Sequence, residues 1–145
     1  MSNQQETVVR RLMDDVWNKG NLKLIDELFT NDYVDNDPMK PTRGLDAARD
    51  VVKQYRSAFP DCRLDIDELF SFGDKVVVRW RYSGTHRGQL EGIAPTGRTV
   101  KGPGITIHRF MNDRIQESHT IWDALGLMQQ LGVVTLPGKA TGAGT

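Results

Sequence analysis

The spacing of apolar residues predicts three helices in the first part of the chain. Residues 3–18 carry an apolar face that repeats every three or four positions, and Gly20 then favours a helix end. Asn21 is a good cap for a second, short helix, and residues 44–59 form a third that ends before Pro60. The apolar stripes consist of Val8, Val9, Leu12, Met13, Val16 and Trp17; Leu24, Ile25 and Leu28; and Leu45, Ala48, Val52, Tyr55 and Phe59.

After Pro60 the apolar period changes from about 3.6 to two, which is typical of strands with one buried face. Gly73-Asp74 and Asn112-Asp113 separate the alternating segments and favour tight turns, because these residues tolerate turn conformations. The pattern therefore predicts long antiparallel strands. We expect them at residues 62–72, 76–82, 98–110 and 114–122.

Two segments between these elements are expected to be loops. Residues 30–41 are dense in Asn, Asp and Pro, which favour turns. Their aspartates resemble a calcium loop only superficially, because the glycine and the terminal glutamate of such a loop are absent. We therefore expect solvated turn residues at Asp32, Asp35 and Asp37. Residues 86–104 are rich in glycine and proline and could rim a pocket.

Helices followed by a strand meander predict an α+β fold. With 145 residues, the chain is expected to form one domain over residues 1–132, which ends in a short apolar helix at 124–131. A chain of this size buries about two-thirds of its unfolded surface, enough for a core that contains a cavity. Residues 133–145 have little apolar content, and we expect a disordered tail there.

Charge and cysteine content narrow the function classes. The 19 Lys and Arg residues balance 19 Asp and Glu residues, so no overall field attracts nucleic acid or an anionic membrane surface. No apolar run reaches the roughly 18 residues of a membrane span, and the N-terminus lacks a signal-peptide pattern. The single cysteine, Cys62, has no partner for an internal disulfide, and no Cys/His cluster predicts a metal site. We expect a cytoplasmic protein that binds neither nucleic acid nor membrane.

Asp123 is the leading candidate for chemistry. It follows the last predicted strand and precedes the helix at 124–131. Such an aspartate can cap the helix by accepting hydrogen bonds from its free N–H groups. If it faces a closed pocket instead, burial raises its proton affinity and makes it an acid/base candidate. The period of two would then place Glu117 and His119 on the same inner face.

Several motifs, in their order along the chain, resemble the SnoaL-like polyketide cyclases, also called ester cyclases, of the nuclear transport factor 2-like superfamily. The resemblance implies a cone-shaped α+β barrel, in which N-terminal helices pack on a curved, mainly antiparallel sheet and enclose an apolar cavity. It also implies a homo-oligomer, dimer or tetramer, formed through the outer sheet face. It runs from about Val8 to Gly132, and its most specific segments are Ala58-Phe-Pro-Asp61, Gly84-Thr-His86, Gly92-Ile-Ala-Pro-Thr-Gly97, Ile107-His-Arg-Phe110, Arg114-Ile-Gln-Glu117, Trp122-Asp123 and Leu125-Gly-Leu-Met-Gln-Gln-Leu-Gly132.

For the site, the resemblance implies that Asp123 is the acid/base and that Asn36 and His108 are pocket residues. It implies no metal and no organic cofactor. His119 stands where many family members carry tryptophan. This histidine is expected either to hydrogen-bond Asp123 or a substrate oxygen, or to pair with Glu117 without a chemical role.

Trp17, Phe110 and His86 are further candidates for substrate contact. Trp17 belongs to the helix that should cover the cavity, and His86 ends a strand beside the long loop. Aromatic and histidine residues at such positions are also typical of a packed core, so that alternative stays open for each of them.

These expectations lead to a cofactor-independent cyclase acting on a hydrophobic small molecule. Asp123 would remove an acidic proton between carbonyl groups, and the enolate would attack a carbonyl of the same molecule in an aldol-type ring closure. The first alternative is an isomerase or an epoxide hydrolase on the same fold, which needs a tyrosine or an arginine beside the acid. The second is a non-catalytic small-molecule-binding or dimerising domain, which an Asp123 directed to solvent would favour.

Overall fold

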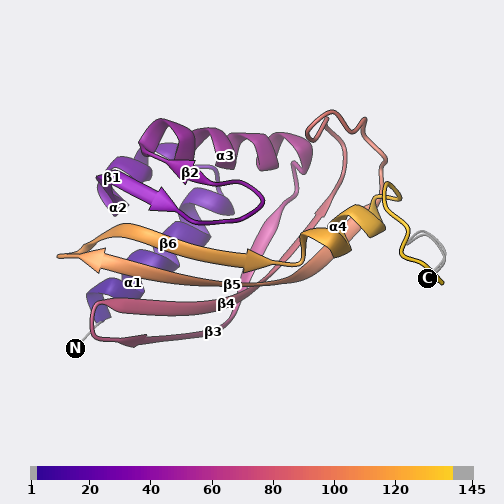
Figure 1. Ribbon diagram of the computed structural model, residues 1–145. Coiled ribbons are helices and arrows are strands. Elements are labelled where there is room, and N and C mark those ends of the chain that lie inside the picture. The colour runs from indigo at the N-terminus through magenta and orange to yellow at the C-terminus, as the bar shows by residue number, and fades with distance from the viewer. Residues whose placement is uncertain (1–2, 139–145) are drawn as a thin grey trace.

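A computed structural model describes residues 3–138, which form four α-helices and six β-strands (Figure 1). Helices open the chain, as expected, but two strands lie between the second helix and the third, so the order is not simply helices followed by strands. The helices are α1 (Asn3–Arg11), α2 (Ile25–Leu28), α3 (Leu45–Ala58) and α4 (Ala124–Gln130). The strands are β1 (Phe29–Asp35), β2 (Thr42–Arg43), β3 (Arg63–Phe72), β4 (Lys75–Thr85), β5 (Thr99–Met111) and β6 (Arg114–Trp122).

All six strands belong to one mixed sheet in the order β2-β1-β6-β5-β4-β3. Strand β1 runs parallel to β6, and every other neighbouring pair is antiparallel. The sheet bends strongly but does not close, because β2 and β3 remain its two edges (Figure 1). The predicted α+β fold is confirmed, with a curved open sheet in place of a fully closed barrel.

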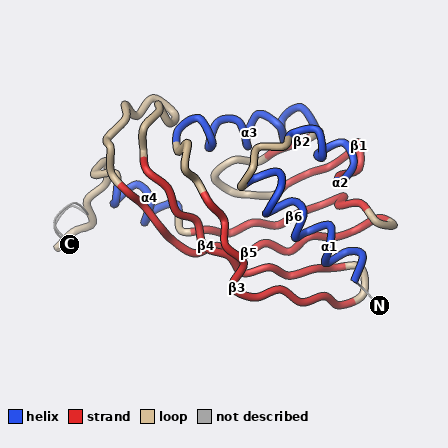
Figure 2. The backbone as a smooth tube through the Cα atoms, turned by 180° about the vertical axis from the view of Figure 1, so that it is seen from behind, coloured by secondary structure: helices blue, strands red, loops and turns tan. Residues whose placement is uncertain are grey.

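The long helices lie on one face of this sheet. Helix α1 continues through a π-helical segment, Leu12–Trp17, and crosses β3 and β4, while α3 packs near β1 and the edge strand β2 (Figure 2). The apolar stripes predicted from the sequence pack between helices and sheet. The fully buried side chains of this core include Val9, Val16, Ile25, Leu28, Val76, Val78 and Ile115.

The segment expected to be a loop, residues 30–41, contains most of a strand. Phe29 and Tyr33 stack with their ring centroids 4.1 Å apart, and both side chains are buried. This packing, together with the parallel pairing of β1 with β6, outweighs the turn preference of the Asn and Asp residues between them. The loop prediction is therefore wrong for residues 30–35.

Strand β6 contains an irregularity that decides which side chains point inward. Arg109 of β5 pairs with Glu117, but the next residue, Phe110, pairs with Ile115, so Gln116 is an extra residue on β6. One extra residue in a strand reverses the inward and outward phase of everything that follows. After this bulge the inner face of β6 carries Ser118, Thr120 and Trp122.

Two glycines of β5 make room for aromatic side chains on the inner face. Gly102 and Gly104 pair with Tyr82 and Trp80 of β4. A Cβ atom at either glycine would collide with the aromatic ring of its partner. The absent side chains therefore let the phenol and the indole lie across β5.

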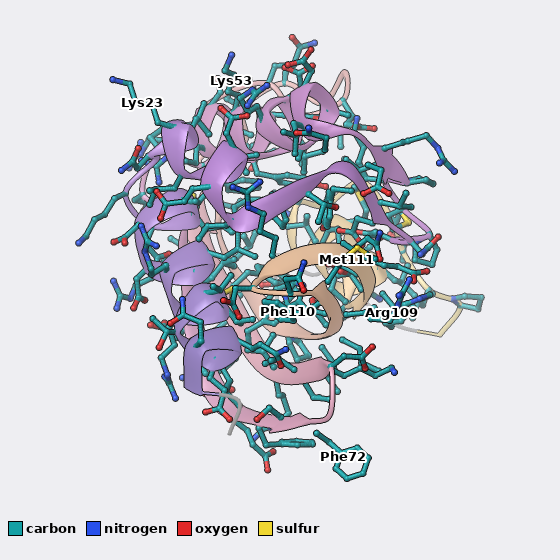
Figure 3. The ribbon with its side chains drawn as sticks, turned by 90° about the vertical axis from the view of Figure 1, so that its left-hand side faces the viewer. Lys23, Lys53, Phe72, Arg109, Phe110 and Met111 are labelled. Carbon is teal, nitrogen blue, oxygen red and sulfur yellow. The ribbon has the colours of Figure 1, made fainter. Side chains whose placement is uncertain are left out.

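The outer face of the sheet is partly apolar and carries no helix of the described chain. Ile121 is 64% exposed, and Ile105, its cross-strand partner, is also exposed. Figure 3 shows Phe72, 87% exposed, projecting away from the rest of the protein at the end of β3. The arginines of β4 on this face, Arg79 and Arg81, both form ion pairs with Asp67.

The C-terminal boundary is described only in part. Residues 133–138 form neither helix nor strand, and the rest of the predicted tail, 139–145, lies outside the described residues. None of the helices within residues 3–138 has the length and apolar character needed to cross a membrane.

Candidate active site

A cavity of about 170 Å³ lies between the helices and the inner face of the sheet. Its wall is mainly apolar and aromatic, and a few polar side chains reach it from β1, β5 and β6. An apolar cavity of about 150 Å³ accommodates benzene. The cavity can therefore hold about one ring of a ligand, and a larger molecule must extend beyond it.

Asp35, at the end of β1, is a half-buried carboxylate in the cavity wall. The hydroxyl of Thr120 donates to its Oδ1 at 3.1 Å, and Thr106 Oγ1 lies 3.3 Å from Thr120 Oγ1. The indole of Trp80 donates to Thr106 Oγ1 at 3.0 Å. An indole N–H only donates, so the hydroxyl protons of both threonines point along the chain toward Asp35. This buried chain fixes the position of the carboxylate.

The surroundings of Asp35 hold it near the midpoint of its titration at neutral pH. The pKa of Asp35 is raised to about 7, mainly by burial and also by the negative charge of Asp37. The hydrogen bond from Thr120 and the more distant His119 act in the opposite direction. A group with a pKa near the working pH can both accept and return a proton, which general acid/base catalysis requires.

Asp37 also borders the cavity, but both of its oxygens are engaged. The indole of Trp122 donates to Oδ2 at 3.1 Å, and the backbone N–H of Met39 donates to Oδ1 at 2.9 Å. Trp122 in turn contacts the rings of Tyr55 and Tyr82 edge-on, with centroids 6.2 and 5.7 Å apart. Asp37 therefore holds an aromatic part of the wall in place.

His108 of β5 faces the same cavity and is buried. Its Nδ1 lies 2.7 Å from the hydroxyl of Ser118, which also bonds to the hydroxyl of Tyr33 at 3.0 Å. Burial lowers the pKa of His108 to about 3, so the imidazole is neutral at physiological pH. The cavity wall thus brings together the carboxylates of Asp35 and Asp37 and one neutral imidazole.

Asp123 lies outside this cavity. Its Oδ1 accepts a hydrogen bond of 2.8 Å from the backbone N–H of Gly126, so it caps helix α4. Its side chain is exposed and borders a second, outer hollow, which shares only Asp37 and Trp122 with the cavity. The reason is the bulge at Gln116, which gives Asp123 the outward phase of the strand that precedes it.

The sequence profile of the SnoaL-like polyketide cyclases matches residues 7–131. The chain belongs to the SnoaL-like polyketide cyclase family. Two curated relatives are aklanonic acid methyl ester cyclases. AcmA of Streptomyces galilaeus is 28% identical over 133 residues, which cover 89% of this chain and 91% of AcmA. DnrD of Streptomyces peucetius is 29% identical over 133 residues, which cover 88% of this chain and 90% of DnrD.

Solved structures show the same fold as this SnoaL-like chain. TsrD from Streptomyces laurentii superposes with a TM-score of 0.83 and 26% identity, and the match covers 91% of this chain and 97% of TsrD. The family assignment made from sequence motifs is therefore confirmed by profile, by relatives and by structure.

Of the site residues expected from this resemblance, Trp17 and His108 line the cavity. Asn36 is exposed and donates to Glu117 and to the carbonyl of Ser118. His119 is exposed on the outer face, and its Nε2 lies 3.2 Å from Glu117 Oε2. This is the pairing with Glu117 that the sequence analysis gave as one of two alternatives.

His86 and Phe110 are also outside the cavity wall. Nδ1 of His86 accepts from the backbone N–H of Thr96 at 3.1 Å, and its ring packs against Phe59, so it fastens the loop at residues 86–98. Phe110 is buried in the core beneath α1 and β1. The structure therefore brings together two of the seven expected residues and separates the other five from them.

Four residues of the cavity wall, Asp35, Tyr33, Thr106 and Thr120, were not expected there from the sequence. Ser118, which bonds to Tyr33 and His108 without lining the wall, was not expected either. The prediction that Asp35 is a solvated turn residue is wrong, because β1 directs it inward. One signal was available: Phe29, Tyr33 and Asp35 share the same odd phase of a strand. Among the described residues, no group of three or more His, Cys, Asp or Glu side chains could hold a metal ion.

Proposed function

We propose that this protein is a cofactor-independent cyclase that closes a ring in a hydrophobic, polyketide-like ester, with Asp35 as the acid/base. The observation that carries the proposal is the Asp35 carboxylate in the wall of a mainly apolar cavity, where its pKa is raised to about 7. The family and the names of AcmA and DnrD support the reaction class.

In the proposed reaction, the ionised Asp35 removes a proton from a carbon that lies between two carbonyl groups. The resulting enolate carbon attacks a second carbonyl carbon of the same molecule, forming one C–C bond while the carbonyl π electrons move to its oxygen. Protonated Asp35 returns the proton to that alkoxide. The product is a cyclic β-hydroxy carbonyl compound, and Asp35 is again ionised.

The cavity contributes mainly geometry to this reaction. The substrate's own conjugated carbonyl groups stabilise the enolate, so the step itself uses no cofactor. Holding two reacting carbons of one flexible chain together removes much of the entropic barrier. Trp17, Tyr55 and Trp122 offer flat apolar surfaces for a ring of the substrate.

The decisive experiment compares Asp35→Asn with Asp123→Asn, because Asp123 is the acid that family resemblance implies. The substrate to use is aklanonic acid methyl ester, as named for AcmA and DnrD. Asparagine at 35 still accepts the bond from Thr120, and asparagine at 123 still caps α4, so both variants should fold. We expect Asp35→Asn to lose activity by roughly 10²–10⁴-fold and Asp123→Asn to retain it. The reverse pattern would assign the chemistry to Asp123 and refute our choice.

A second candidate function is a non-catalytic binding domain, because Asp123 is directed to solvent. It predicts that aklanonic acid methyl ester binds without turnover in the wild type and in both variants. The isomerase and epoxide hydrolase alternatives have less support: Arg109 pairs with Glu117 at the outer face, and Tyr33 bonds to Ser118. Beside Asp123, Tyr82 Oη donates to the backbone carbonyl at 3.2 Å and not to the carboxylate.

A further inference from the structure

A hydrogen-bonded chain inside the protein sets the role of His108. Tyr33, Ser118 and His108 come from three different strands, β1, β6 and β5, and all three side chains are buried. The distances are 3.0 Å from Tyr33 Oη to Ser118 Oγ and 2.7 Å from Ser118 Oγ to His108 Nδ1. A neutral imidazole carries its proton on one nitrogen and accepts on the other, so its neighbours decide which nitrogen donates.

The direction of this chain follows from the donors. The phenol of Tyr33 donates to Ser118 Oγ, and a phenol is a much stronger acid than an aliphatic hydroxyl. Burial and the charge of Asp35 both raise the pKa of Tyr33, so the phenol keeps its proton. Ser118 therefore has its own hydroxyl proton free for Nδ1 of His108. If Ser118 directs that proton to His108, Nδ1 accepts and the ring proton is on Nε2.

The other nitrogen, Nε2, is open to the cavity. Within residues 3–138, Nε2 has no hydrogen-bond partner. Two other unpaired side-chain atoms, Gln5 Oε1 and His86 Nε2, are fully enclosed, whereas Nε2 of His108 keeps some accessible surface. Since His108 lines the cavity, the remaining accessible space at Nε2 is cavity space.

We propose that Ser118, oriented by Tyr33, is a positioning residue that holds His108 as the Nε2–H tautomer, so that the cavity receives a hydrogen-bond donor. The ligand group that fits this donor is an oxygen anion next to an apolar ring, such as an enolate or phenolate oxygen. A neutral donor in a low-dielectric site stabilises such charge as it forms. The enolate part of this inference rests on the proposed function, whereas the tautomer does not.

The spacing of the two polar groups agrees with this assignment. His108 pairs with Ser118 on one rung of the β5–β6 ladder, and Thr106 pairs with Thr120 two residues further along. Two residues of a strand span about 7 Å. His108 is therefore separated by about that distance along the sheet from the Thr106–Thr120 pair, and Thr120 holds the Asp35 carboxylate. In a bound carbonyl compound, the distance from a base at the acidic carbon to a hydrogen-bond donor at the carbonyl oxygen is similar, roughly 7–8 Å.

The test is NMR of the intact protein with ¹⁵N-labelled histidine, at a pH near 7.5 and without ligand. We expect His108 to show a protonated Nε2 and an unprotonated Nδ1. His86 is an internal reference, because Thr96 N–H donates to its Nδ1 and fixes the same tautomer. Ser118→Ala should convert His108 to a mixture of tautomers. Tyr33→Phe, which keeps Ser118, should do so as well and covers the case in which Ser118→Ala does not fold.

The matched control is Ser57→Ala, which removes an exposed hydroxyl on α3 and should leave the His108 signals unchanged. A proton on Nδ1 in the wild type, or an unchanged His108 tautomer in both hydroxyl variants, would overturn the inference. With a turned-over substrate, Ser118→Ala should lower kcat about 10-fold with little change in KM, less than the 10²–10³-fold loss for a whole donor.

The tautomer and the proposed function can fail separately. An Nε2–H tautomer together with full activity of Asp35→Asn would refute the acid/base assignment and leave the role of Ser118 intact. An inactive Asp35→Asn together with an Nδ1–H tautomer would refute only the role of Ser118.

Discussion

Replacing Asp35 with asparagine should make the protein more stable at alkaline pH. The folded protein binds the Asp35 proton more tightly than the unfolded chain does, because the cavity raises the pKa of Asp35 from 3.8 to about 7. Wherever the folded state holds more protons, stability falls as pH rises. The wild type should therefore lose stability between about pH 4 and pH 7 through this group, and Asp35→Asn should not.

The size of the effect follows from the same pKa. Each pKa unit corresponds to about 1.36 kcal/mol, so a fully buried acid with this pKa would cost about 4 kcal/mol when ionised. Asp35 is half-buried, and solvent screening reduces the figure. We expect Asp35→Asn to exceed the wild type by about 1–2 kcal/mol in free energy of unfolding at pH 8. At pH 4.5 the two should be nearly equal.

Urea unfolding at pH 4.5, 6 and 8, followed by tryptophan fluorescence, measures this difference. The control is Ser57→Ala, which removes an exposed hydroxyl that does not titrate, so its difference from the wild type should not change over the same range. If Asp35→Asn is equally stable or less stable than the wild type at pH 8, ionisation of Asp35 does not lower the free energy of unfolding. The acid/base assignment would then lose its physical basis.

Three further predictions concern other parts of the molecule. Asp123→Ala removes the cap of α4 and should cost about 1 kcal/mol in urea unfolding, whereas Asp123→Asn should cost almost nothing. His86→Leu removes the acceptor of the partly buried hydrogen bond from the Thr96 N–H and should cost about 0.5–1.5 kcal/mol in the same assay. The exposed Ile105 and Ile121 lead us to expect a dimer or tetramer through the outer sheet face; light scattering should give a multiple of 16.3 kDa, and Ile121→Lys should reduce it to that mass.

The strands of the second half of the chain could be predicted because their sequence period is unambiguous. Gly73 and Asn112 both adopt positive φ in the structure, as the turns predicted at these positions require. Strand β1 could not be predicted in this way. Its Asn and Asp residues have turn propensity, and only the contact with β6, far away in the sequence, makes the segment extended.

The site was harder to predict than the fold because its geometry depends on one residue. Counting by two from Ile115 places His119 and Asp123 inside, and this counting fails where Gln116 is inserted. No local composition distinguishes a bulged strand from a regular one. Asp35 was missed for a related reason, since its inward direction depends on β1 being a strand.

The hydrogen bond between Trp122 and Asp37 lies between the inner cavity and the outer hollow. These two side chains are the wall that the inner and outer hollows have in common. Exchanging the indole for a smaller ring would merge both hollows into one longer channel while Asp35, Thr120 and His108 keep their places on the sheet. In the proposed reaction, substrate size and proton transfer would thus depend on separate residues, and a substitution at position 122 would change the substrate without moving Asp35, Thr120 or His108.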